Sequence, residues 1–317
     1  MLYRKLGKTG LKISAISLGS WQTFGQSVAD DETEACLQAA YDAGVNFFDG
    51  AEAYGSGAAD AAVGRALKKH GWPRDTYLLS GKCIRGGDRP DQKGLSRKRL
   101  RNCCDNTLQR YGTDHLELFF CHRPDPDTPL EEIVTTMNAL IQQGKILYWG
   151  TSEFSAADLM KLWAIADANG MEGPVVEQTG ANMLARDRIE NQLVPLFDHY
   201  GMGTTIYSPL AVGLLTGKYN ESTPSDSRLG NPDAPEWMKK HLSEERLEKA
   251  RKIGAIAKEL GITQAHLALA WLLRNPNVST CLTGARQAKQ VEENVKAVEA
   301  VDKLSDEVMS RLREIIE

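Results

Sequence analysis

Short apolar segments recur along the chain roughly every thirty residues, the length of one strand and one helix, and this recurrence constrains the fold more than any other feature. The segments are nearly continuous apolar runs, the pattern of strands that are buried on both faces. They comprise residues 15–18, 46–48, 76–80, 116–121, 146–149, 175–177, 204–207 and 278–282. The sequence therefore predicts eight parallel strands.

Amphipathic segments with helical start and stop signals lie between these strands. Residues 31–44 open with Asp31 and Glu34 in capping-box positions and end at Gly44. Residues 96–111, 129–143 and 155–169 follow the same plan, and a glycine follows each of them. The alternation indicates a parallel α/β sheet, closed or doubly wound, and eight units favour closure into a (β/α)8 TIM barrel.

Three segments fall outside the repeat. Residues 3–13 predict an N-terminal hairpin, and residues 305–316 predict a capped C-terminal helix. Residues 217–242 are polar and too long for an ordinary connection, so we expect them to cover the mouth of the barrel. A chain of 317 residues with this repeat fits a single domain over residues 1–317.

Composition narrows the choice of partners. The net charge of -4 and the isoelectric point near 5.9 argue against a nucleic acid and against an anionic membrane surface. No apolar stretch approaches the length of a signal peptide or membrane span, so we expect a soluble, cytoplasmic protein without membrane insertion. The spacing of the cysteines and histidines predicts free thiols and no metal site.

Polar residues at strand ends are the candidates for chemistry, because the active site of a β/α barrel lies at the carboxyl ends of its strands. Asp49 ends the second apolar segment and Tyr54 follows it. Lys82 follows the third segment and His122 follows the fourth. We therefore expect a carboxylate, a phenol, an ammonium and an imidazole to meet at one rim.

These four groups suit the reduction of a carbonyl, in which a hydride reaches carbon and a proton reaches oxygen. Tyr54 is the candidate acid, and we expect the Lys82 ammonium to lower its pKa. Asp49 would keep Lys82 charged, and His122 would hydrogen-bond the carbonyl. Taken singly, each residue has an ordinary explanation as a cap, a surface charge or a core side chain; the four together favour catalysis.

The chain resembles the aldo-keto reductases, and specifically the branch that contains the potassium-channel β-subunits and their bacterial relatives. The resemblance spans nearly the whole chain. It rests on FDGAEAYG at 48–55, SGK at 80–82, HRPD at 122–125, WGTSE at 149–153, YSPLA at 207–211, GLLTGKY at 213–219 and EEN at 292–294. It implies that Asp49, Tyr54, Lys82 and His122 form a catalytic tetrad with Tyr54 as the general acid.

The resemblance also implies NADP(H) as cofactor, bound across the mouth of the barrel. Ser152 and Gln178 would bind the carboxamide, and Tyr207 would stack on the nicotinamide. The charges of Arg286 and Lys289 favour NADPH over NADH. The full set of implied cofactor residues is Trp21, Asp49, Ser152, Gln178, Tyr207, Ser208, Leu210, Gly213, Lys218, Arg228, Gly284, Arg286, Gln290, Glu293 and Asn294.

Two positions depart from the family pattern. The usual Gln-x-x-Tyr-Asn reads QTGAN at 178–182, so Ala181 stands where an aromatic is usual. Glu153 follows Ser152 where many members carry asparagine. Both changes fall in the expected surroundings of the nicotinamide.

Three functions are consistent with the sequence. The first is NADPH-dependent reduction of small aldehydes or ketones, with aldose and sugar-phosphate carbonyls among the candidates. The second is a cofactor-binding regulatory subunit of a membrane channel with slow turnover, as in some members of the branch. The third is a cofactor-free barrel isomerase or lyase, which failure to bind any nicotinamide would reveal. A homo-oligomer is compatible with each of these functions.

Overall fold

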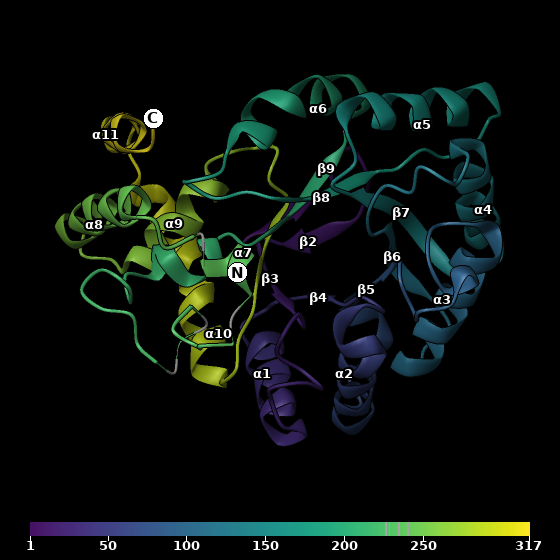
Figure 1. Cartoon of the computed structure of the whole chain (residues 1–317), viewed down its shortest axis with the longest axis horizontal. Coiled ribbons are helices and arrows are strands. Elements are labelled where there is room, and N and C mark those ends of the chain that lie inside the picture. The colour runs from purple at the N-terminus through teal and green to yellow at the C-terminus, as the bar shows by residue number, and fades with distance from the viewer. Residues whose placement is uncertain (226, 228, 234, 240) are drawn as a thin grey trace.

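The computed structural model describes residues 1–225, 227, 229–233, 235–239 and 241–317. Parallel strands close into a barrel in the order β10-β3-β4-β5-β6-β7-β8-β9 (Figure 1). Their bounds are β3 Ile16–Gly19, β4 Phe47–Asp49, β5 Leu78–Cys83, β6 Leu116–Cys121, β7 Ile146–Ser152, β8 Val176–Gly180, β9 Gly203–Tyr207 and β10 Thr280–Thr283. The predicted TIM barrel is confirmed.

Helices surround these strands, as Figure 1 shows for α1 to α6. The α-helices are α1 Asp30–Asp42, α2 Ala58–His70, α3 Arg97–Tyr111, α4 Leu130–Gln142, α5 Ala156–Ala168, α6 Val194–Tyr200, α7 Glu236–Lys239, α8 Glu244–Glu259, α9 Gln264–Leu273, α10 Ala288–Val295 and α11 Asp306–Ile316. Shorter helical turns are η1 Tyr54–Gly57, η2 Arg74–Thr76, η3 Pro90–Gln92, η4 Arg188–Gln192, η5 Ala211–Thr216 and η6 Lys296–Lys303. The predicted C-terminal helix is thus α11, and Ser305 caps it.

Alternate strands supply one apolar cluster of the core. Phe47 of β4, Leu118 of β6, Val176 of β8 and Leu282 of β10 are all buried in it. Side chains from every second strand form the layers that fill a β/α barrel. The barrel is therefore a packed core, and a site must lie at one of its ends.

The N-terminal hairpin lies against the amino ends of the strands. Its strands β1 Tyr3–Lys5 and β2 Lys12–Ser14 are antiparallel, and Leu6 and Ile13 join the cluster just described. The Lys8 amide donates to the Gly201 carbonyl ahead of β9 at 2.7 Å. The hairpin thereby covers the amino end of the barrel and leaves the carboxyl ends for a site.

Two local expectations differ from the structure. Helix α1 begins at Asp30, so its N-cap position is Ala29, whose side chain cannot accept a hydrogen bond, and Asp31 lies inside the first turn. The predicted capping box is therefore wrong. Strand β5 begins two residues later than expected and extends to Cys83, which places Lys82 inside the strand.

The described part of the polar stretch 217–242 is anchored to the C-terminal helices. Leu229 and Met238 are buried in the cluster that contains residues of α8 and α9. The Tyr219 hydroxyl accepts from the Leu229 amide at 3.1 Å. Arg228, which the family resemblance assigns to the cofactor, lies outside the described residues.

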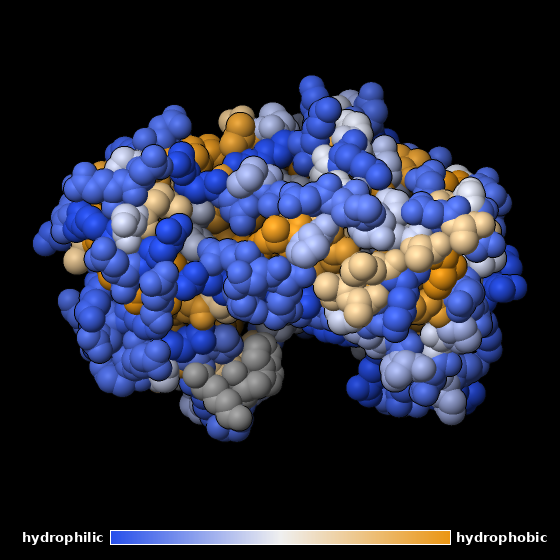
Figure 2. Space-filling view, turned by 90° about the horizontal axis from the view of Figure 1, so that it is seen from above, coloured by the Kyte–Doolittle hydropathy of each residue, from blue (hydrophilic) through white to orange (hydrophobic). Residues whose placement is uncertain are grey.

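Polar residues dominate the face of the molecule in Figure 2. Large exposed apolar side chains are Met1, Leu2, Tyr3, Leu147 and Met160. Within the described chain, the helices are too short or too polar to span a membrane.

Candidate active site

The structure brings Asp49, Tyr54, Lys82 and His122 together at the carboxyl ends of the strands. Asp49 ends β4, Lys82 lies near the end of β5, and His122 directly follows β6. Tyr54 begins η1, the turn that follows β4. Because β4, β5 and β6 are neighbours in the barrel, their ends present these side chains to one space.

Lys82 is the centre of this group. Its Nζ donates to Asp49 Oδ2 at 2.6 Å, to the Gly50 carbonyl at 2.7 Å and to Tyr54 Oη at 3.3 Å. The side chain is fully buried, and burial lowers its pKa while the Asp49 charge opposes that effect. An ammonium with three acceptors is held in one orientation, aimed at the phenol.

Asp49 is fixed from its other side. Its Oδ1 accepts from the Ser80 hydroxyl at 2.8 Å and from Gln178 Nε2 at 3.1 Å. Gln178 Nε2 also donates to Thr205 Oγ1 at 3.1 Å. The carboxylate is therefore hydrogen-bonded through both oxygens, which fixes its orientation beside Lys82.

Burial raises the pKa of Tyr54 well above its usual value, and the Asp49 charge raises it further. The expectation of a lowered Tyr54 pKa is therefore wrong. The physical reason is desolvation, which disfavours the phenolate more than nearby cations favour it. Tyr54 keeps its proton at neutral pH and can donate it.

His122 is neutral. Burial, followed by the charges of Lys82 and Arg123, lowers its pKa to about 2. Its ring lies edge-on to the Tyr54 ring with centroids 5.7 Å apart. Among the described residues, nothing hydrogen-bonds its buried Nδ1. A neutral imidazole beside the phenol can donate one N–H to a bound oxygen.

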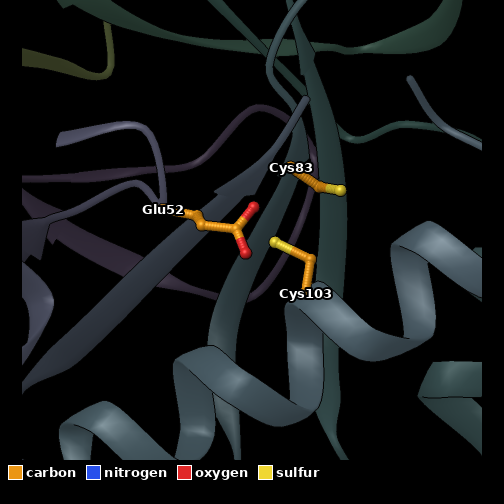
Figure 3. Close-up of side chains that lie close together, drawn as sticks. All are labelled: Glu52, Cys83 and Cys103. Carbon is orange, nitrogen blue, oxygen red and sulfur yellow. The ribbon is translucent and has the colours of Figure 1, made fainter. Parts of the chain in front are cut away.

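Behind the tetrad, Glu52, Cys83 and Cys103 point toward one another from the loop after β4, from β5 and from α3 (Figure 3). Their ligand atoms lie within 4.8 Å of one another, as in a metal site. The buried Arg99 guanidinium, however, pairs with Glu52 and donates to the Gln92 carbonyl at 3.0 Å. That cation already neutralises the carboxylate, so we interpret the cluster as a tie between α3 and the Tyr54 loop.

Asp60 is a buried carboxylate that the sequence analysis missed. Tyr111 donates to the Ser80 carbonyl at 3.1 Å and to Asp60 Oδ1 at 3.3 Å, next to Asp49 and its partners. Burial raises the pKa of Asp60 to about 6, against the charge of Arg110. The available signal was an acid on the otherwise apolar face of α2.

The residues expected around the nicotinamide lie on the next three strands. Ser152 ends β7, Gln178 lies in β8 and Tyr207 ends β9. Glu153 accepts from the Gly180 amide at 2.9 Å and from the Thr179 hydroxyl at 3.0 Å. A β-carbon at Gly180 would lie 2.9 Å from the Tyr207 ring, so this glycine allows the ring to pack against β8.

Ala181 and Glu153, the two departures from the family pattern, therefore have structural partners here. Ala181 is fully buried, and its amide donates to the Tyr207 carbonyl at 3.4 Å. Glu153 has a φ of +61° and ties the end of β7 to β8.

The remaining expected cofactor residues follow β3, β9 and β10, which are adjacent in the barrel. Trp21 follows β3, and Ser208, Leu210, Gly213 and Lys218 follow β9. Arg286 precedes α10, and its amide donates to Gln290 Oε1 at 2.7 Å. The Glu293 carboxylate forms an ion pair with Lys296 at 2.7 Å. Gly284 and Asn294 lie before and within α10.

Backbone strain is concentrated in these rim loops. Among the described residues, the non-glycine positions with positive φ are Gln22, Ser56, Glu153, Ser208, Ala211 and Val212, and each follows the carboxyl end of a strand. Strained positions of this kind persist only where surrounding contacts enforce them, and they gather at ligand sites. The strain supports a ligand site at this end of the barrel.

Comparison with known proteins agrees with this geometry. The profile of the Aldo/keto reductase family matches residues 15–317. A "Probable voltage-gated potassium channel subunit beta" of Arabidopsis thaliana is 43% identical over 318 residues, which cover 100% of this chain and 97% of that protein. A "Putative voltage-gated potassium channel subunit beta" of Schizosaccharomyces pombe is 42% identical over 325 residues, which cover 99% of this chain and 93% of that protein.

Proposed function

Because this chain belongs to the aldo-keto reductase family of NAD(P)-dependent oxidoreductases, we propose that it uses NADPH to reduce small aldehydes or ketones to alcohols. Aldose and sugar-phosphate carbonyls are candidate substrates. The observation that carries the proposal is the position of the Lys82 ammonium, between the Asp49 carboxylate at 2.6 Å and the Tyr54 hydroxyl at 3.3 Å. This arrangement suits the delivery of a proton to a carbonyl oxygen.

The proposed proton path uses the protonation states described above. Tyr54 donates its proton to the carbonyl oxygen as that oxygen becomes an alkoxide, a base strong enough to take a proton from this partly buried phenol. Lys82 stabilises the phenolate that remains, and Asp49 keeps Lys82 in its charged form. His122 donates a hydrogen bond to the same oxygen and orients it. NADPH, when bound, supplies the hydride.

The residues around the proposed nicotinamide position fit that group. Both hydrogen bonds of the Gln178 side chain use Nε2, which leaves Oε1 as an acceptor for the carboxamide. The Ser152 hydroxyl would bind the other end of the carboxamide, and the half-buried Tyr207 ring would stack on the nicotinamide. At the far end, the exposed Arg286 and Lys289 would bind the 2′-phosphate that distinguishes NADPH from NADH.

The test is consumption of NADPH with a panel of aldehydes, ketones and aldoses, for the wild type and for Tyr54→Phe. We expect Tyr54→Phe to bind NADPH as the wild type does, while turnover falls by about a hundredfold or more, the scale of a lost general acid. Turnover that is unchanged in the variant would remove Tyr54 from this role. Fluorescence titration with NADPH measures the binding arm.

The names of the relatives favour a second candidate, a cofactor-binding subunit of a potassium channel with slow turnover. The two functions differ in what they require. A reductase turns over on its own, whereas a channel subunit copurifies with a membrane protein and needs only slow chemistry. We propose a cytoplasmic location for either role.

A further inference from the structure

Arg123 lies beside the reacting groups but has no assigned role. It follows His122 after β6 and is exposed at the rim. Its Nη1 donates to the His122 carbonyl at 2.6 Å and to Ser152 Oγ at 2.8 Å. The guanidinium therefore lies between the imidazole of the tetrad and the serine proposed to hold the carboxamide.

No carboxylate among the described residues forms an ion pair with Arg123, because the nearby acids are engaged elsewhere. Asp49 pairs with Lys82, and Glu153, the residue after Ser152, accepts from the Gly180 amide at 2.9 Å and from the Thr179 hydroxyl at 3.0 Å. Asp125, two residues along the chain, accepts from the Leu95 amide at 2.7 Å and from the Thr128 hydroxyl at 2.6 Å. An exposed cation at the rim is thus left without a counter-ion from this part of the protein.

We propose that Arg123 binds a carboxylate or phosphate group on the carbonyl substrate, so that the enzyme selects anionic aldehydes or ketones. This inference rests on the proposed reductase function. A guanidinium carries five N–H donors, and the contacts to His122 and Ser152 use only Nη1. The remaining donors can form the forked hydrogen bonds that arginine makes to carboxylates and phosphates.

The competing explanation is a purely structural one. The same two hydrogen bonds join the loop after β6 to the end of β7, and a clip of this kind would support the site for every substrate alike. The two roles differ in one measurable quantity, the ratio of kcat/KM for a charged substrate to kcat/KM for an uncharged one. Loss of a clip lowers both values together, whereas loss of recognition lowers the ratio.

The experiment uses two matched pairs of substrates at saturating NADPH. Glyceraldehyde 3-phosphate is compared with glyceraldehyde, and succinic semialdehyde with butanal. We expect the wild type to prefer the charged member of at least one pair, and the preferred pair tells phosphate from carboxylate. Arg123→Met should lower that ratio by about tenfold to a hundredfold, the scale of lost charged hydrogen bonds. Arg123→Lys keeps the charge but not the forked donors of the guanidinium, so its ratio should lie between those of the wild type and Arg123→Met.

Arg85→Met is the matched control, because it removes the same charge from the loop after β5, where Arg85 pairs with Asp88. It should leave the ratio at the wild-type value. A wild type that reduces butanal or glyceraldehyde without preferring either charged partner would overturn the inference while leaving the reductase function in place. An equal loss for both members of a pair in Arg123→Met would also overturn it. Failure to reduce any of the four aldehydes would overturn the reductase function and the inference together.

Two further measurements keep the test decisive. NADPH titration of Arg123→Lys should give the wild-type affinity. If the affinity for NADPH is instead weak enough to explain the fall in kcat/KM, Arg123 binds the cofactor and not the substrate. If Arg123→Met does not fold, the test is the salt dependence of the wild-type preference for the charged substrate. Attraction at an exposed site is screened by salt, so the preference must fall as ionic strength rises, and a preference that salt leaves unchanged contradicts the proposal.

Discussion

Burial fixes the protonation states of the side chains proposed to be catalytic. His122 is neutral, and Tyr54 holds its proton, because desolvation disfavours the charged form of each. Lys82 is buried more deeply than either, but Asp49 and the Gly50 carbonyl supply the acceptors that its ammonium needs. The site can therefore hold one charged donor and one neutral acid within hydrogen-bond distance of each other.

The low pKa of His122 predicts a specific dependence of stability on pH. Between its usual value of 6.5 and about 2, the unfolded chain binds a proton that the native protein does not. The free energy of unfolding therefore falls as pH drops below about 6.5, by about 1.4 kcal/mol per pH unit from this group. We expect the wild type to lose about 2 kcal/mol more than His122→Asn between pH 8 and pH 5, in urea unfolding. Equal losses in the two proteins would contradict a neutral His122.

Sequence position located the tetrad but not its electrostatics. Asp49, Lys82 and His122 could be found because they end apolar segments, and Tyr54 because it follows one. The direction in which the pKa of Tyr54 is shifted was missed, because the depth at which a strand end is buried depends on the closed barrel. Arg123 and Asp60 were missed because their contacts cross from one strand or helix to another.

At the scale of elements, the two ends of the barrel have different tasks. The hairpin lies at the amino end, and Arg4 of β1 donates to the carbonyls of Asn275 at 3.1 Å and Val278 at 2.6 Å ahead of β10. The tetrad and the strained loops lie at the carboxyl end. Stability and chemistry can therefore be changed separately.

We expect Arg4→Met to reduce the free energy of unfolding by about 2 kcal/mol, because charged hydrogen bonds to carbonyls are lost at a partly buried position. Turnover should stay at the wild-type value, since the change lies at the opposite end from the tetrad. Urea unfolding and steady-state kinetics measure the two effects. Lys5→Met, at the exposed neighbouring position, is the control. A loss of turnover without a loss of stability in Arg4→Met would contradict this division.

Element boundaries were predictable where the chain carries its own signal. Ser96 and Ser155 accept from amides in the first turns of α3 and α5, as their positions before apolar faces indicate. The start of α1 was not predictable in this way, because the helix begins at Asp30, one residue before the expected cap Asp31, and its N-cap Ala29 carries no signal. The start of β5 depends on pairing with β4, where Phe47 lies opposite Leu78, and the sequence alone does not contain that register.

At the scale of the whole molecule, closure joins the first and last strands. Strand β10 pairs with β3, with Cys281 opposite Ile16, and with β9 on its other side. The expected cofactor residues that follow β3, β9 and β10 thus come from opposite ends of the chain. The number of apolar segments favoured this closure, whereas the packing of the hairpin beneath the barrel could not be read from their spacing.

We propose that residues 1–317 unfold as one domain, because neither end of the chain can complete the barrel alone. A single transition is expected in thermal unfolding, and NADPH at a hundred times its Kd should add about 2.7 kcal/mol of stability. NADH at the same concentration should add less, and Arg286→Ala should reduce the difference between them. Two separate transitions would contradict the single domain, and equal stabilisation by both nucleotides in the wild type would contradict the 2′-phosphate assignment.

All six cysteines of the chain are buried. Four of them, Cys83, Cys103, Cys104 and Cys121, lie in one sector formed by β5, α3 and β6, while Cys36 and Cys281 lie in α1 and β10. Only an exposed thiolate reacts with alkylating reagents, so labelling must wait until a sector opens. The rate at which each cysteine is alkylated therefore reports how often its part of the barrel opens. The order of these rates would rank the parts of the barrel by their local stability.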